Sequence, residues 1–119
     1  MANSDYYIGL ISGTSVDGVD CALVQFEGNQ PKLIASHCEA IDPDLRETIL
    51  QLCSGKNIDL ELLGTTDIAI GQLFAKGVAT LLAKETIEKS SILAIGSHGQ
   101  TVFHHPVGDT RFSLQIGDP

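Results

Sequence analysis

The first forty residues alternate short apolar runs with polar breaks that contain glycine, a pattern typical of strands joined by tight turns. Apolar residues concentrate at positions 6–11, 21–26 and 32–41, and the pattern predicts a strand at each. The break between the first two runs contains the step Asp17-Gly18, which can supply the positive φ angles of a hairpin turn. The first third of the chain is therefore predicted to be an antiparallel three-stranded meander.

The middle of the chain changes to helical spacing. An Asp-Pro pair begins a predicted helix over residues 42–55, and a glycine ends it. Apolar residues recur at helical spacing over residues 59–85, which predicts one long amphipathic helix or a pair of them. Gly64, Gly71 and Gly77 lie inside this segment, and each costs about 0.5–1 kcal/mol relative to Ala in a helix. We attribute them to close helix packing or to a break.

The last third returns to strand-like runs. Residues 91–96 form a compact apolar strand pattern, and we expect a polar loop over 97–101 directly behind it. Residues 102–105 and 112–116 flank a turn at 106–110 and are predicted to pair as a hairpin. Ligands in open α/β sheets lie beyond the carboxyl ends of strands, so the 97–101 loop is a candidate for binding. The fold class is α/β, with a β-meander followed by helices and further strands.

Composition limits the kinds of partner. The chain has 119 residues, a formal charge of −8 and 43% hydrophobic residues, which suits a globular core and argues against disorder. The seven Lys and Arg residues do not cluster, so we expect neither a nucleic-acid partner nor an anionic membrane surface. A phosphate ligand would then depend on backbone amides or on a metal ion.

Cysteine spacing and the chain ends bear on localisation. Cys21, Cys38 and Cys53 fit neither a CxxC motif nor a paired disulfide framework, and we expect three reduced core thiols in a cytoplasmic protein. The start of the chain has no basic leader, and no apolar run approaches the ~18 residues of a membrane helix. Because the chain stops directly after a strand-like run, we expect the protein to continue beyond Pro119.

The polar segment 12–20 is the first candidate site. Glycines allow a ligand to approach the backbone closely, hydroxyls donate to anionic oxygens, and carboxylates hold Mg²⁺ through water. The segment contains all three: Gly13 and Gly18, Ser12, Thr14 and Ser15, and Asp17 and Asp20. A plain hairpin turn would contain similar residues, and spacing alone leaves both interpretations open.

Several known motifs fail at this segment. A Walker A loop needs Lys followed by Ser or Thr after its second glycine, whereas Val19-Asp20 follows Gly18. A G-x-S-x-G nucleophile elbow would need glycine at position 17, where Asp17 stands, and no G-x-G-x-x-G motif is present.

The histidines near the carboxyl end do not predict a zinc site. His104 and His105 are adjacent on a predicted strand and point to opposite faces, and zinc would need further ligands. His98, between Ser97 and Gly99, suits a hydrogen bond to a ligand hydroxyl, and a loop histidine with partners inside the chain is the alternative interpretation.

Three segments in this order resemble the anhydro-N-acetylmuramic acid kinase family: ISGTSVDGVD at 11–20, GSHGQTVFH at 96–104 and LQIGDP at 114–119. The resemblance implies an RNase H-like, actin-like ATPase lobe, and residues 1–119 would be the amino-terminal part of the first lobe of a two-lobed kinase. It also implies a reaction in which water opens the anhydro bridge of 1,6-anhydro-N-acetylmuramic acid and O6 takes the γ-phosphoryl group of ATP. The product, N-acetylmuramic acid 6-phosphate, returns cell-wall (peptidoglycan) sugar to metabolism.

The same resemblance assigns roles to residues. ATP, with Mg²⁺, would be bound by Gly13, Thr14, Ser15, Val16, Asp17, Gly18, Val19 and Asp20, with Asp17 and Asp20 contacting metal-bound water. His98, Gln100 and Thr101 would contact the amino sugar, and the water-activating aspartate would lie beyond Pro119. The sequence leaves open whether the protein forms a homodimer. The alternative is a non-catalytic binding module of the same fold, in which segment 12–20 is only a hairpin turn.

Overall fold

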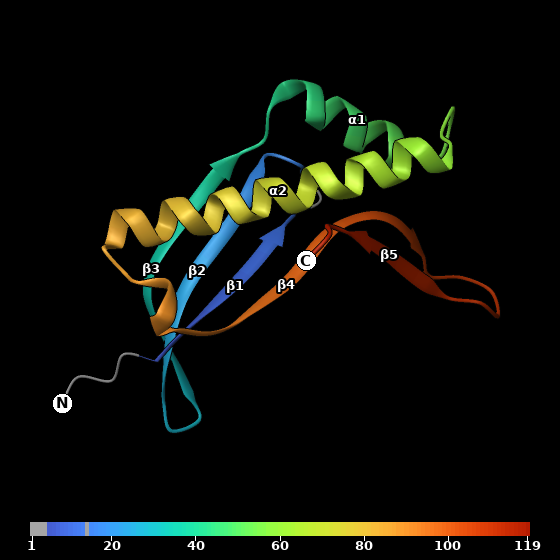
Figure 1. Cartoon of the computed structure of the whole chain (residues 1–119). Coiled ribbons are helices and arrows are strands. Elements are labelled where there is room, and N and C mark those ends of the chain that lie inside the picture. The colour runs from blue at the N-terminus through green and yellow to red at the C-terminus, as the bar shows by residue number, and fades with distance from the viewer. Residues whose placement is uncertain (1–4, 14) are drawn as a thin grey trace.

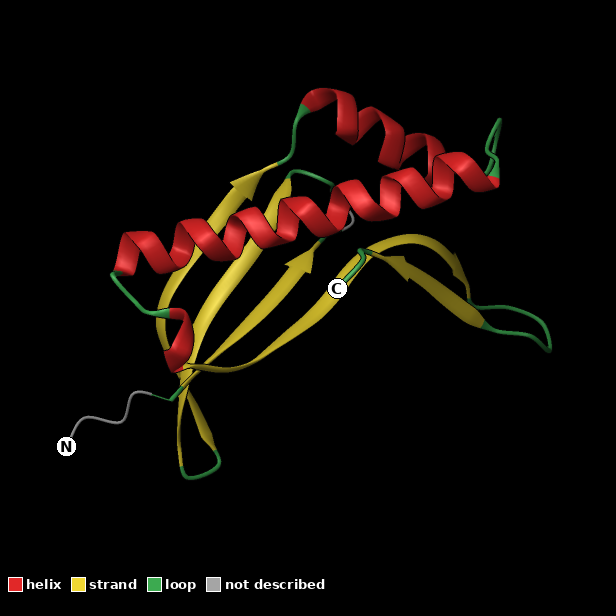
Figure 2. Ribbon diagram, in the orientation of Figure 1, coloured by secondary structure: helices red, strands yellow, loops and turns green. Residues whose placement is uncertain are grey.

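The computed structural model describes residues 5–13 and 15–119 of the chain, so Thr14, predicted to bind the cofactor, lies outside the described residues. The fold is a five-stranded sheet with two helices packed on one face (Figure 1, Figure 2). The elements in chain order are β1 (Tyr6–Ser12), β2 (Gly18–Glu27), β3 (Gln30–Ala40), α1 (Pro43–Ser54), α2 (Leu60–Glu85), the 3-10 turn η1 (Lys89–Ser91), β4 (Ile92–His105) and β5 (Phe112–Ile116).

The strands lie in the order β3-β2-β1-β4-β5. Strands β1, β2 and β3 form the predicted antiparallel meander, and β4 and β5 form the predicted hairpin. Strand β4 runs parallel to β1. Parallel neighbours need a long crossover connection, which α1 and α2 supply.

Both helices begin and end where the sequence predicts. Gly55 ends α1 in the left-handed region, at φ 70°, and its N–H donates to the Leu52 carbonyl. Asp59 caps α2, and its carboxylate accepts the N–H of Leu62 at 2.8 Å. Helix α2 then runs unbroken for 26 residues, so the segment is one helix and not a pair.

Two of the three glycines in α2 mark close packing. A Cβ at Gly77 would lie 2.8 Å from the Sγ of Cys21 on β2, and one at Gly71 would lie 2.3 Å from the Asp118 carbonyl oxygen. A Cβ at Gly64 would meet no atom within 4 Å. Close packing therefore explains Gly71 and Gly77 but not Gly64.

The core lies between the helices and the sheet face that they cover. Alternate residues of β1 and β2 point into it, as the period of a strand requires. It contains Ile8, Leu10, Val19, Cys21 and Leu23 from the strands, Ile49 and Leu52 from α1, and Ile70, Phe74 and Leu81 from α2.

An ion network joins β3 to α2 at the edge of this core. The Glu39 carboxylate lies 3.1 Å from Nε2 of His37 and 3.8 Å from Nζ of Lys76. The hydrogen bond from His37, opposed by partial burial and assisted by the Lys76 charge, lowers the pKa of the Glu39 carboxyl.

The prediction of a loop at 97–101 was wrong, because β4 runs through these residues. Those residues belong to one continuous strand, and Gly99 forms an irregularity in it at φ 75°. The strand changes neighbours there, because Gln100 pairs with Ser12 of β1 and also with Ile116 of β5. A Cβ at Gly99 would lie 2.7 Å from the Ile116 carbonyl oxygen, so close approach of β5 also favours glycine.

The prediction that all three cysteines lie in the core was correct for Cys21 only. Cys21 is buried, and burial, followed by the nearby Glu39 carboxylate, raises the pKa of its thiol to about 11. Cys38 is exposed because it lies on the sheet face that the helices leave open. Cys53 is also exposed, although its Sγ lies 3.9 Å from the Thr101 carbonyl oxygen of β4. All three thiols are free. Among the described residues, no helix combines the length and apolarity that a membrane crossing needs.

Candidate functional site

The two candidate segments meet at the carboxyl end of β1. Ser12, the last residue of β1, pairs with Gln100 of the parallel strand β4. The β1–β2 connection therefore begins beside the segment 98–101, although the two lie more than eighty residues apart in sequence. This position, past the end of a central strand, is where open α/β sheets bind ligands.

The connection from β1 to β2 is a tight turn that contains a strained residue, Val16. The Val16 N–H donates to the Gly13 carbonyl at 3.1 Å, which closes the turn. Val16 has φ 55°, a conformation that costs a β-branched residue roughly 1–3 kcal/mol, and its side chain is fully buried. Such a conformation persists only where packing imposes it, so the buried Val16 side chain fixes the loop backbone.

The predicted positive φ at Asp17-Gly18 was wrong, since Val16 takes that role. Gly18 is the first residue of β2, and a Cβ there would lie 2.7 Å from the Cys38 Sγ and 3.0 Å from the Glu39 carbonyl oxygen. Gly18 is thus explained by the close approach of β3. At Gly13, by contrast, a Cβ would meet only open space.

Exposure divides the predicted cofactor-binding residues into two groups. Gly13, Ser15, Asp17 and Asp20 are exposed, whereas Val16, Gly18 and Val19 are buried. The buried residues can offer a ligand only backbone groups. The exposed ones present a hydroxyl and two carboxylates to solvent.

Gln100 is a buried anchor of this loop. Its side chain is 1% exposed, and its Oε1 accepts the hydroxyl of Ser12. Its Nε2 donates to the carbonyl of Gly13 at 3.3 Å and to that of Thr101 at 3.1 Å. The amide of Gln100, predicted to contact a sugar, thus bonds within the chain and ties β4 to the start of the loop.

Arg46 of α1 is a second anchor, which the sequence did not reveal. Its Nε donates to the Val16 carbonyl at 3.2 Å, and its Nη2 donates to the Ser15 carbonyl at 3.3 Å. In sequence, Arg46 has the pattern of an ordinary solvent-facing helix residue. No short-range signal connects it with a loop 30 residues earlier.

A shallow groove of about 530 Å³ lies on the open face of the sheet beside the loop. Asp20 and His98, predicted for different ligands, both line it, together with Gly9, Ile11, Cys38 and Gly96. Partial burial and the neighbouring Asp20 carboxylate raise the pKa of the Cys38 thiol, so it is not an activated nucleophile. The lining is mainly apolar, and Asp20 and His98 are among its few polar side chains.

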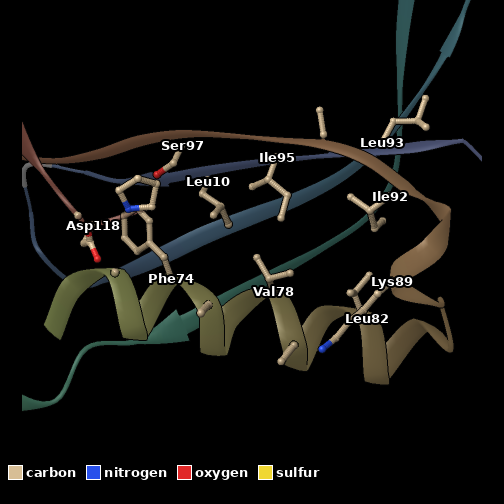
Figure 3. Close-up of a pocket in the computed structure, with 16 residues that line it drawn as sticks. Leu10, Phe74, Val78, Leu82, Lys89, Ile92, Leu93, Ile95, Ser97 and Asp118 are labelled. Carbon is tan, nitrogen blue, oxygen red and sulfur yellow. The ribbon is translucent and has the colours of Figure 1, made fainter. Parts of the chain in front are cut away.

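A second groove, of about 570 Å³, lies between α2 and β4 (Figure 3). Leu10, Phe74, Val78, Leu82 and Ile95 are directed into it from the helix and the strands. Its lining is largely apolar, and it includes none of the described residues 13 and 15–17 of the turn. It suits an apolar group and not a phosphate.

Direct metal ligands are scarce near the loop. The described part of the chain holds no group of three or more His, Cys, Asp or Glu side chains able to bind one ion. His104 instead lies 2.5 Å from the hydroxyl of Ser113, and His105 stacks with Phe103. Asp17 and Asp20 are exposed carboxylates, so a Mg²⁺ ion there would keep several waters and complete its shell with ligand phosphates.

Comparison with known proteins adds an independent finding. Residues 5–119 match the family model described as anhydro-N-acetylmuramic acid kinase. The chain is 52% identical over 117 residues to a protein of that name from Shewanella pealeana, and 55% identical over 117 residues to one from Shewanella sp. strain ANA-3. Each alignment covers 98% of this chain and 32% of the relative, so the chain spans about a third of the length of these curated relatives.

Proposed function

Because this chain belongs to the anhydro-N-acetylmuramic acid kinase family, we propose that it is the amino-terminal part of an ATP-dependent kinase for 1,6-anhydro-N-acetylmuramic acid. In the proposed reaction, water attacks the anomeric carbon, the anhydro bridge opens, and the freed O6 takes the γ-phosphoryl group. The products are ADP and N-acetylmuramic acid 6-phosphate, and the proposed setting is cytoplasmic recycling of peptidoglycan sugar.

The observation that carries this proposal is the anchored turn 13–17 at the carboxyl end of β1. Phosphoryl transfer asks a protein mainly for positioning and for electrostatic stabilisation. A turn fixed by a buried Val16 side chain, with Ser15 exposed beside it, supplies rigid backbone and a hydroxyl donor for phosphate oxygens. The strain at Val16 supports the proposal, because strained backbone of this kind clusters at binding sites.

The exposed carboxylates support a role for Mg²⁺. A bound Mg²⁺ ion would neutralise charge on the phosphates of ATP, which this acidic chain has few basic side chains to do. Asp17 and Asp20 fit contacts to metal-bound water, since both are exposed and neither belongs to a preformed ligand cluster of the described residues.

For the sugar we propose the open-face groove. His98 is exposed there and could donate to or accept from a sugar hydroxyl, with Asp20 in the same groove. Thr101 is half-buried, and its hydroxyl accepts a hydrogen bond from Gln115. Gln100 would position the loop and would not contact the sugar, because its amide donates hydrogen bonds to the Gly13 and Thr101 carbonyls.

We also propose an actin-like lobe. A three-stranded antiparallel meander whose first strand pairs in parallel with β4 across a helical crossover supports this assignment. The general base and the second lobe would then come from the two thirds of the relatives' length that this chain does not span.

ADP release by the full-length protein tests the proposal. We expect release from ATP and Mg²⁺ to depend on 1,6-anhydro-N-acetylmuramic acid. Deleting residues 12–20 should abolish it, and the milder pair Ser15→Ala with Asp17→Asn should lower it about tenfold or more. Asp109→Asn, in the exposed β4–β5 turn, is the control and should retain activity. ADP release that does not depend on the sugar, or activity undiminished by the deletion, would contradict the proposal.

A further inference from the structure

Two successive carbonyl groups of the β1–β2 turn are bound by a single side chain. Arg46 donates from Nε to Val16 and from Nη2 to Ser15, at 3.2 Å and 3.3 Å. The guanidinium group is planar, and its N–H groups point in fixed directions. Arg46 therefore sets the orientation of two neighbouring peptide groups, which a single hydrogen bond could not do.

The orientation of these peptide groups decides where their amides point. In a trans peptide the C=O and N–H vectors are opposed, and no described peptide bond is cis. Since the Val16 carbonyl faces Arg46 on α1, the amide of the same peptide group, that of Asp17, points away from α1. The Val16 amide, from the peptide group whose carbonyl Nη2 binds, turns back to Gly13 and closes the turn.

We propose that Arg46 is a positioning residue for phosphate binding: by holding the Ser15 and Val16 carbonyls against α1, it keeps the turn closed and directs the Asp17 amide toward the ligand. This inference rests on the proposed function, since it concerns how the same loop binds ATP. Without the hydrogen bonds from Arg46, those carbonyl oxygens could rotate toward the phosphates and repel them. Arg46 also places a positive charge behind the loop of a chain whose net charge is −8.

The chain offers a matched comparison in Arg111. Its Nε donates to the Gly108 carbonyl at 3.2 Å, so it too is an exposed arginine that binds a turn carbonyl. It differs in lying in the β4–β5 turn, away from the β1–β2 loop. Substitutions at Arg111 therefore control for the loss of an arginine and of a surface hydrogen bond.

The test uses the full-length protein carrying Arg46→Lys, Arg46→Met or Arg111→Met. For each variant we would measure the KM for ATP, the KM for the anhydro sugar, the dissociation constants of ATP with Mg²⁺ and of adenosine, and the melting temperature. We expect both Arg46 variants to raise the KM and the dissociation constant for ATP about tenfold. The KM for the sugar and the affinity for adenosine should stay within about twofold, and Arg111→Met should match the wild type.

The lysine variant separates geometry from charge. Lysine keeps the positive charge but cannot bind two carbonyls as a planar fork, so Arg46→Lys should be impaired like Arg46→Met. Full rescue by lysine would overturn the positioning role, as would equal losses of ATP and adenosine affinity or Arg46 variants that match Arg111→Met. A wild-type protein without sugar-dependent kinase activity would instead refute the proposed function. If that inactive wild type still binds ATP more tightly than Arg46→Met does, the role of Arg46 in phosphate binding stands on its own.

Discussion

Replacing Gln100 by leucine should destabilise the protein by about 2–4 kcal/mol. Leucine fills a similar volume, so the change removes mainly hydrogen bonds. The Ser12 hydroxyl, which is 4% exposed, would be left buried without its acceptor, at a cost of about 1–3 kcal/mol. The bonds to the Gly13 and Thr101 carbonyls would be lost as well, but Gly13 is exposed, so water can replace part of its bond.

The assay is urea unfolding of the full-length protein followed by far-ultraviolet circular dichroism, because this segment contains no tryptophan. Gln115→Leu is the matched control. Gln115 is exposed and donates one hydrogen bond, at 3.1 Å to the Thr101 hydroxyl, so its loss should cost less than about 0.5 kcal/mol. Equal free energies of unfolding for the two variants would refute the role of Gln100 as a buried anchor.

Three further predictions concern other parts of the fold. Gly77→Ala should destabilise the protein by about 1–3 kcal/mol, because its Cβ would lie 2.8 Å from the Cys21 Sγ, whereas Gly64→Ala on the same helix should stabilise it by about 0.5–1 kcal/mol; thermal unfolding of both variants checks this. The lowered pKa of Glu39 adds stability that is fully present above its ordinary pKa of 4.5 and is lost as the pH falls through the lower folded value. As the pH falls through this range, the free energy of unfolding should therefore decrease more for the wild type than for Glu39→Gln. Parallel plots of the free energy of unfolding against pH would contradict this. Alkylation of the native protein at mildly alkaline pH, followed by mass spectrometry, should modify exposed Cys38 well before buried Cys21, and equal rates would contradict the assigned burial.

Local patterns were sufficient to predict most elements of the fold. The meander, both helices and the final hairpin follow from apolar periodicity and from end signals such as Gly55 and Asp59. The interruption expected at residues 97–101 was wrong for a tertiary reason. A glycine-containing polar segment has the pattern of a loop, but here β4 changes partners from β1 to β5 at Gln100 and keeps its extended backbone.

Residue types in the sequence suggested the candidate site, but they did not indicate which contacts hold it in place. The structure places the start of the segment 12–20 beside Gln100, and its role in binding a ligand stays a prediction. The positive φ was assigned to Asp17-Gly18 because sequence rules place it on glycine, whereas the buried Val16 side chain imposes it on a β-branched residue. The Arg46 and Gln100 anchors depend on contacts 30 and 87 residues away, which a local pattern does not contain.

The central claim is that the anchored β1–β2 loop serves a sugar kinase. The most direct test is mass spectrometry of the products formed when the full-length protein is given ATP, Mg²⁺ and 1,6-anhydro-N-acetylmuramic acid. We predict N-acetylmuramic acid 6-phosphate and ADP in equal amounts. An unphosphorylated sugar, or ADP formed without a phosphorylated sugar, would contradict the claim.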